Sequence, residues 1–319
     1  MKMFMNILKI IRQNVINILW QHYCQFTPEM QRIQHCLPIP THATEALDHV
    51  ALVDLPGPRT GIAVLCALFE SIGYTPRGKG YLPDKQNDFL WMAEQTADQQ
   101  SLAESLPQIV IGDFRLAQLP KTISNIIIKY ANQAPPIPLA LIEKYIQFLK
   151  KRAATSYVYQ TGIPRLMIVL KHHLLHRKWP LPTQLEFESI QAHNPLLAWV
   201  LVYGAQPNHF AIAIHHFSAF KDFMTFKNYI ETQQITLNQE GEGPIKGGFS
   251  QGIAQASTIG TTHHLALQEG HITLPTNFIE FVWRYPEPRH CLPKKWGDYF
   301  RGFVAAQANH VIESLYDKP

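Results

Sequence analysis

Two stretches of the sequence, LDHVALVDL (47–55) and PNHFAIAIHHF (207–217), decide the fold. Successive side chains of a β-strand point to opposite faces, and both stretches have the composition and the alternation of a strand. Each carries a histidine as its third residue, His49 in the first and His209 in the second. The pattern therefore predicts two strands that begin alike and that each present a histidine on one face.

A helix and further strands are predicted to follow each of these two strands. GIAVLCALFESIG (61–73) is amphipathic and ends at a glycine, and residues 218–233 have helical spacing. The predicted strands are YTPRGKGYL (74–82), NDFLWMAE (87–94) and QIVIGDF (108–114) in the first unit, and ITLN (235–238), HHLALQE (263–269) and TNFIEFVWRY (276–285) in the second. The order strand, helix, strands therefore occurs twice.

Prolines and helical spacing complete the outline of one α+β domain over 1–319. APPIP (134–138) separates the two units, and the residues after it have the pattern of broken helices. We expect N-terminal helices over 1–40, a first half over 41–133, a helical insert over 134–206, and a second half with a C-terminal helix over 207–319.

The composition excludes several classes of protein. The 319 residues carry a formal net charge of +4 with scattered basic residues, so we expect no nucleic acid partner. No run of about 20 apolar residues predicts a membrane span, and the N-terminus has the pattern of a docked helix rather than of a signal peptide. The four cysteines form no C-x-x-C pair, which favours reduced thiols in the cytoplasm.

The 16 histidines favour a metal site, since histidine is the commonest metal ligand near neutral pH. His49 and His209 open equivalent strands, so they converge if the two halves pack face to face. Glu280 lies inside an otherwise apolar strand, where a buried carboxylate needs a cation or a proton. Two imidazoles and one carboxylate form the usual site of Fe(II) oxygenases. Pairing of Glu280 with Arg284 is the alternative, but it would have to span about 13 Å of strand.

Several blocks of the sequence also resemble a known family. They are LWQHYCQFTP (19–28), ALDHVAL (46–52), LFESIGY (68–74), YGAQPNHFAI (203–212), IKGGFSQGIAQAST (245–258), LPTNFIEFVWRY (274–285) and GDYFRGFVAAQANHVIESLYD (297–317). In this order they resemble the family formerly called domain of unknown function 1338, now associated with 2-oxoadipate dioxygenase/decarboxylase. The resemblance implies two vicinal-oxygen-chelate-like sheet units that form an incomplete barrel around a metal.

The resemblance also implies a metal site and a reaction. The family's His–His–Glu metal ligands fall on His49, His209 and Glu280. The implied reaction is similar to that of hydroxymandelate synthase: Fe(II) chelates a 2-oxo acid, which reacts with O2, loses CO2 and is hydroxylated. With 2-oxoadipate the product is 2-hydroxyglutarate. Zn(II), Ni(II) or Mn(II) fit the same ligands, so the sequence leaves the metal open.

One position departs from the family. The family has an arginine four residues after its first histidine, where it helps to hold the substrate, and this chain has Val53 there. Arg59 in the following turn is one candidate replacement. Other candidates for contacts with the substrate or with the metal ligands are Lys246, Gln255, Ser257 and Arg284. Without the family arginine the substrate is expected to be a different, less acidic 2-oxo acid, or the activity to be weak.

The sequence also allows other metal-binding histidines and other functions. KHHLLH (171–176) places His172 and His176 one helical turn apart, but it lacks the glutamate of H-E-x-x-H. One of His263 and His264 is a further candidate for a contact with a metal ligand. A metal-dependent lyase or isomerase and a non-catalytic protein that binds small acids are alternative functions. A hydrolase is disfavoured because no G-x-S-x-G motif occurs.

Overall fold

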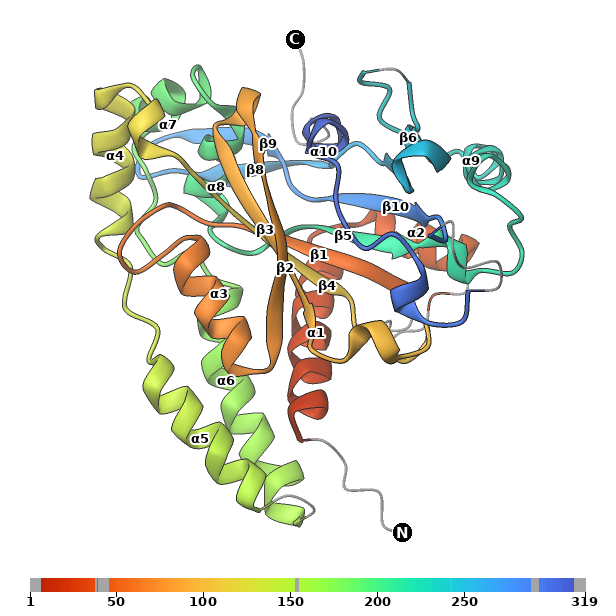
Figure 1. The fold of residues 1–319 in the computed structure, drawn as a ribbon. Coiled ribbons are helices and arrows are strands. Elements are labelled where there is room, and N and C mark those ends of the chain that lie inside the picture. The colour runs from red at the N-terminus through yellow and green to blue at the C-terminus, as the bar shows by residue number, and fades with distance from the viewer. Residues whose placement is uncertain are drawn as a thin grey trace.

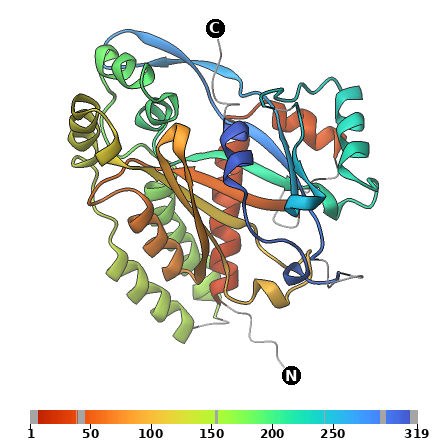
Figure 2. The ribbon, with the colours of Figure 1, turned by 45° about the horizontal axis from the view of Figure 1, so that its top comes forward.

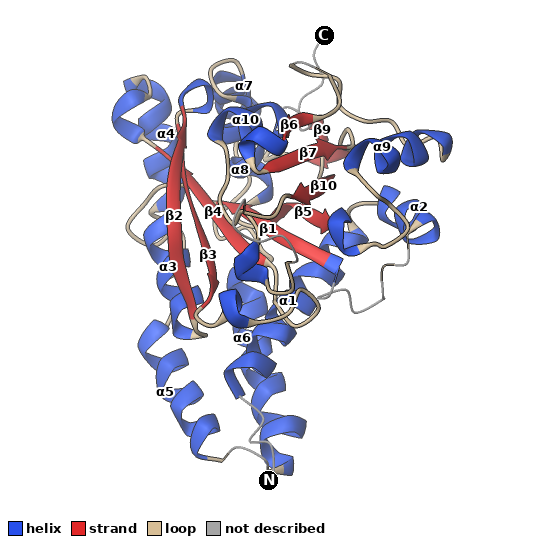
Figure 3. Ribbon diagram, turned by 45° about the vertical axis from the view of Figure 1, so that its right-hand side comes forward, coloured by secondary structure: helices blue, strands red, loops and turns tan. Residues whose placement is uncertain are grey.

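One strongly curved sheet of eight strands organises the protein (Figure 1). The computed structural model describes residues 7–37, 39, 46–152, 155–241, 243–287 and 293–312. The strands of the sheet follow the order β2-β3-β4-β1-β5-β10-β7-β6, and a separate hairpin is formed by β8 and β9. Figure 3 shows the sheet as a continuous layer with helices around it.

The first four strands of the chain form one half of the sheet and the later strands form the other. The bounds of the first half are β1 (Leu47–Val53), β2 (Tyr74–Leu82), β3 (Asn87–Glu94) and β4 (Gln108–Phe114). Those of the second half are β5 (Pro207–Ala213), β6 (Lys246–Gly248), β7 (Ile253–Ser257) and β10 (Phe278–Arg284). The hairpin comprises β8 (Thr262–Ala266) and β9 (His271–Pro275).

The two halves repeat one arrangement, as the sequence predicted. In each half the first strand pairs in parallel with the last one, β1 with β4 and β5 with β10. The remaining strands continue outward in antiparallel fashion. β1 and β5 then pair with each other in antiparallel fashion and join the halves. The predicted fold class, an α+β protein with two such units, is confirmed.

Helices cover the sheet and fill the segment between the halves. Their bounds are α1 (Ile7–Gln25), α2 (Glu29–Cys36), α3 (Ile62–Ser71), α4 (Lys121–Ala131), α5 (Leu139–Lys151), α6 (Ile163–Leu174), α7 (Gln184–Gln191), α8 (Pro195–Tyr203), α9 (Phe223–Thr232) and α10 (Ala305–Ile312). None of the described helices combines the length and the apolar composition needed to cross a membrane.

The outer face of the sheet forms the larger hydrophobic core. Val50 of β1 and Phe210 of β5 are fully buried there together with residues of α1, α3 and α9. Trp20 of α1 meets the ring of Phe210 edge-on, with 5.1 Å between the ring centroids. Because alternate residues of β1 and β5 are held outward in this way, the other residues of these strands are turned toward the inside of the curve.

Helix α10 lies across the inside of the curved sheet (Figure 2). It contacts β2 near one edge of the sheet and both β6 and β7 near the other edge. The helix therefore encloses the space that the inward-facing side chains of β1, β5 and β10 line.

Two details of the predicted second half were wrong. The strand over 207–217 stops at Ala213, and residues 214–216 form a 3-10 turn instead. Residues 235–238 form no strand, because only an isolated bridge joins Leu237 to Thr258. The small-residue segment around Gln255 forms strand β7.

Candidate metal centre

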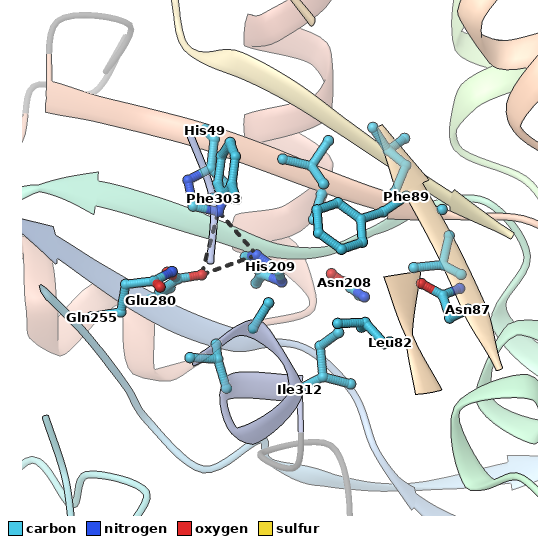
Figure 4. Close-up of a pocket in the computed structure, with 17 residues that line it drawn as sticks. His49, Leu82, Asn87, Phe89, Asn208, His209, Gln255, Glu280, Phe303 and Ile312 are labelled. Carbon is cyan, nitrogen blue, oxygen red and sulfur yellow. Dashed lines mark hydrogen bonds and ion pairs between the residues drawn. The ribbon is translucent and has the colours of Figure 1, made fainter. Parts of the chain in front are cut away.

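Three neighbouring strands bring His49, His209 and Glu280 together, as predicted (Figure 4). His49 lies on β1, His209 on β5 and Glu280 on β10. Ala211 of β5 pairs with His49 on one side and with Glu280 on the other. Because alanine is small, the two longer side chains can meet above it.

The facing atoms of the three side chains form a small triangle. His49 Nε2 lies 3.2 Å from His209 Nε2 and 3.3 Å from Glu280 Oε2. His209 Nε2 lies 3.1 Å from the same carboxylate oxygen. All three residues are buried. Two imidazole nitrogens and a carboxylate oxygen thus face one point.

This donor set fits a divalent cation. Metal–ligand bonds of about 2.0–2.2 Å place neighbouring ligand atoms roughly 3 Å apart, which is close to the observed separations. Two histidines and one carboxylate on one face leave the opposite positions of an octahedral ion open. Among the described residues, this is the one group of three or more potential ligands that comes together in this way.

The charges of the group favour a cation as well. Burial alone would raise the pKa of Glu280, but the two histidines hold it at about 2. Burial also opposes protonation of His49, yet the charge of Glu280 and the hydrogen bond to Asp48 raise its pKa to about 9. For His209, burial dominates and lowers the pKa. Glu280 is therefore ionised and His209 is neutral near neutral pH, which are the forms that bind metals, whereas His49 would have to give up its Nε2 proton to the solvent when a cation binds.

A buried ion pair fixes the orientation of His49. Its Nδ1 lies 2.7 Å from Asp48 Oδ1 and donates a hydrogen bond to that oxygen. Asp48 is in turn held by Arg284, with Nε 2.6 Å from Oδ2 and Nη2 2.8 Å from Oδ1. Arg284 lowers the pKa of Asp48 against the effect of burial, so the carboxylate stays charged. A histidine whose Nδ1 is held by a carboxylate presents Nε2 as its ligand atom.

Gln255 and Phe303 hold the other sides of the group. Gln255 Nε2 donates a hydrogen bond of 2.5 Å to Glu280 Oε1, which leaves Oε2 facing the two histidines. The ring of Phe303 meets His49 edge-on, with 4.9 Å between the centroids. Hydrogen bonds therefore hold His49 and Glu280 in place, whereas His209 is held by its stacking on the ring of Phe278, with 4.6 Å between the centroids, and its Nδ1 has no partner among the described residues.

An apolar cavity opens beside the three potential ligands (Figure 4). Its lining comes from β1 to β5, β7, β10 and α10. Val53 lines this cavity, and so does Gln255. Ser257 is buried on β7 directly opposite Glu280 in the strand pairing. Gln255 and Ser257 therefore lie beside the group, whereas Val53 lies farther along the cavity wall.

Three other predicted residues lie elsewhere or have other partners. Arg59 is exposed, and its Nη1 donates to the carbonyl of Ala134. Lys246 donates to the carbonyls of Asn238 and Gly243 and does not line the cavity. Arg284 pairs with Asp48 rather than with Glu280, and its Nη1 donates to two further carbonyls, those of Phe300 and Gly302. Neither Arg59 nor Arg284 lines the cavity.

The sequence did not identify Asp48 and Asn208 as residues of the site, although each precedes one of the two histidines. The pairing of β1 with β5 shifts register at both positions, so each is an extra residue in its strand. Such β-bulges break the alternation of side chains. As a result Asp48 reaches its neighbour His49, and Asn208 lines the cavity beside its neighbour His209. Strict alternation along the strands would place both residues on the outer face.

The other histidines considered in the sequence do not extend the group. His172 and His176 are exposed on α6 and just beyond it. His264 is exposed on the hairpin and its Nδ1 lies 2.9 Å from Thr273 Oγ1, while His263 is partly buried there. None of these four residues lines the cavity.

The family model of 2-oxoadipate dioxygenase/decarboxylase matches residues 19–287 of the sequence. This match spans the strands that carry all three potential ligands. The chain belongs to this family. No match was found among curated protein sequences.

Solved structures share the fold of this family member. Hydroxyglutarate synthase from Oryza sativa, determined in complex with 2-oxoadipate, is 22% identical with a TM-score of 0.73, covering 97% of this chain and 93% of that chain. A putative hydrolase from Shewanella frigidimarina is 20% identical with a TM-score of 0.68, covering 91% and 96%. A putative glyoxalase superfamily protein from Ralstonia eutropha is 14% identical with a TM-score of 0.71, covering 92% and 86%. These likenesses support the vicinal-oxygen-chelate type of fold.

Proposed function

We propose that this protein is an Fe(II)-dependent dioxygenase/decarboxylase of a 2-oxo acid. The observation that carries the proposal is the convergence of His49, His209 and Glu280 beside a buried cavity, in a member of this family. These three side chains would hold the metal. The family substrate, 2-oxoadipate, would give 2-hydroxyglutarate and CO2.

The proposed reaction balances without a further reductant. The C1–C2 bond of the 2-oxo acid breaks and C1 leaves as CO2, while C2 becomes the new carboxyl carbon with one oxygen atom from O2. The other oxygen atom converts a C3–H bond to a hydroxyl group. The four electrons that reduce O2 come from the substrate, two from each bond. When bound, Fe(II) would supply the chelating template and the redox chemistry.

The residues of the chain then have distinct tasks. Asp48 and Arg284 keep Nε2 of His49 directed at the metal position, and Gln255 keeps one oxygen of Glu280 directed there. The apolar lining would exclude water and surround the carbon chain of the substrate. These tasks require little movement, because the side chains already hold these positions.

Oxygen uptake by metal-loaded protein tests the proposal. The protein is loaded anaerobically with Fe(II), its iron content is measured, and O2 uptake and CO2 release are followed with a panel of 2-oxo acids. We expect one O2 consumed and one CO2 released per 2-hydroxy acid formed, with Zn(II)-loaded protein inactive as the control. Full iron occupancy without O2 uptake on any 2-oxo acid would leave a lyase, an isomerase or a binding protein instead.

Replacing Gln255 by methionine tests how strongly the neighbours of the ligands matter. The substitution keeps the length of the side chain but removes the hydrogen bond to Glu280 Oε1. Loss of such a partner costs about 10–100-fold in metal affinity or activity. Calorimetric titration of the metal-free variant with Zn(II) measures this change. An affinity equal to that of the wild type would assign Gln255 to packing alone.

A further inference from the structure

The far part of the cavity has an apolar lining. Beyond the three potential ligands, side chains of β1, β2, β3, β4 and α10 surround the space, among them Val53, Leu82, Phe89, Val110, Val311 and Ile312. No lysine or arginine of the described part of the chain lines it. The polar contributions there are the uncharged amides of Asn87 and Asn208.

Two buried cations of the described core, Arg284 and Lys178, are held by other partners. Arg284 is held by Asp48 and by two backbone carbonyls. Lys178 is paired with Asp54, with 3.4 Å between Nζ and Oδ2. Both cations and both carboxylates are buried, so pulling either cation away would leave an uncompensated buried charge. Neither is available to neutralise a ligand in the cavity.

Asn208 marks the cavity as a place for a ligand. The side chain is fully buried, and neither its Oδ1 nor its Nδ2 has a hydrogen-bond partner within the described residues. Its position on the bulge of β5 turns it into the cavity next to His209 (Figure 4). A buried amide without partners is costly, and a bound molecule would satisfy it. An amide can both donate and accept, but it cannot neutralise a carboxylate.

From the lining and its lack of cations, we propose that the cavity takes a 2-oxo monocarboxylic acid with an uncharged tail. This rests on the proposed function, in which the 2-oxo acid group lies at the metal. A second carboxylate, as in 2-oxoadipate, would lie among apolar side chains without a counter-ion, and burial of such a charge is strongly disfavoured. Val53 contributes an apolar side chain to this lining, so we expect the residue at position 53 to influence the preference.

The neighbours of Val53 determine what a longer side chain at this position would contact. Val53 pairs across the sheet with Gly112, which has no side chain and also lines the cavity. The amide of Asn87 lies over Gly112, since a Cβ at position 112 would be 3.0 Å from Asn87 Oδ1. A longer side chain at position 53 would therefore extend toward the amide of Asn87.

Anaerobic calorimetry with Zn(II)-loaded protein tests the inference without any turnover. The ligands are three 2-oxo acids of equal chain length: 2-oxohexanoate, the 6-amide of 2-oxoadipate and 2-oxoadipate itself. We expect at least one of the two monocarboxylates to bind at least about tenfold more tightly than 2-oxoadipate, because the missing contact is charge-assisted. Equal or tighter binding of 2-oxoadipate would overturn the inference.

Substitutions at position 53 provide the matched comparison. Val53→Arg is expected to reverse the preference in favour of 2-oxoadipate, whereas Val53→Met, which adds length without charge, is expected to keep an uncharged tail preferred. If the arginine variant does not fold, the wild-type titrations still decide. If the wild type binds the metal but prefers 2-oxoadipate, only this inference is wrong. If the wild type binds no metal at all, the proposed function is wrong as well.

Discussion

His209→Ala is expected to lose stoichiometric metal binding and turnover. His209 supplies one of the three facing donor atoms, at 3.1 Å from Glu280 Oε2 and 3.2 Å from His49 Nε2. Loss of a residue that only supports a ligand weakens binding about 10–100-fold, so loss of a ligand should cost at least about 100-fold. Calorimetry with Zn(II) and measurement of the metal content after dialysis give the two numbers.

His176→Ala is the matched control for this experiment. His176 is exposed, does not line the cavity and belongs to the other histidine cluster of the sequence. Its replacement is expected to leave metal content and O2 uptake unchanged. If the His209 variant retained full metal content while the His176 variant lost it, the metal would have to be assigned to α6 and the residues just after it.

Arg284→Met is expected to lower the free energy of unfolding by about 3–5 kcal/mol, since it leaves the buried Asp48 carboxylate without its partner. Both side chains of the pair are fully buried. Arg284 also donates to the carbonyls of Phe300 and Gly302, which precede α10, so the variant should loosen this segment. Urea unfolding followed by circular dichroism measures the loss.

A second substitution separates the charge from the packing. In the double variant Asp48→Asn, Arg284→Met no uncompensated carboxylate is left, so part of the lost stability should return. Its metal affinity should stay low, because His49 Nδ1 has lost its carboxylate. A loss of less than about 1 kcal/mol in the single variant would mean that Asp48 is neutralised by another group.

The sequence was sufficient to predict those parts of the fold and of the site that depend on the regular alternation of side chains along strands. His49 and His209 open equivalent strands, and Glu280 is a carboxylate in an apolar strand, so their convergence could be inferred from the repeat and from the family resemblance. The repeated order of strand, helix and strands also appears in the structure. These features are local, or they follow from symmetry between the two halves.

The supporting residues could not be predicted because they depend on irregular or long-range structure. Asp48 and Asn208 face their neighbouring histidines only because β1 and β5 shift register there. Arg284 lies 236 residues from Asp48 in sequence, and nothing in its own strand identifies that partner. Arg59 lies in a turn whose direction depends on packing against the segment around Ala134.

The order of β1, β5 and β10 along the chain also bears on when during synthesis the proposed metal site could form. The two histidines are 160 residues apart, and Glu280 comes later still. Contacts between residues so distant form late, because the entropy of closing long loops must be overcome first. A nascent chain that has not yet exposed β10 outside the ribosome therefore lacks one donor, whatever the metal concentration. If the proposed metal needs all three donors, we expect it to bind only after these strands have paired.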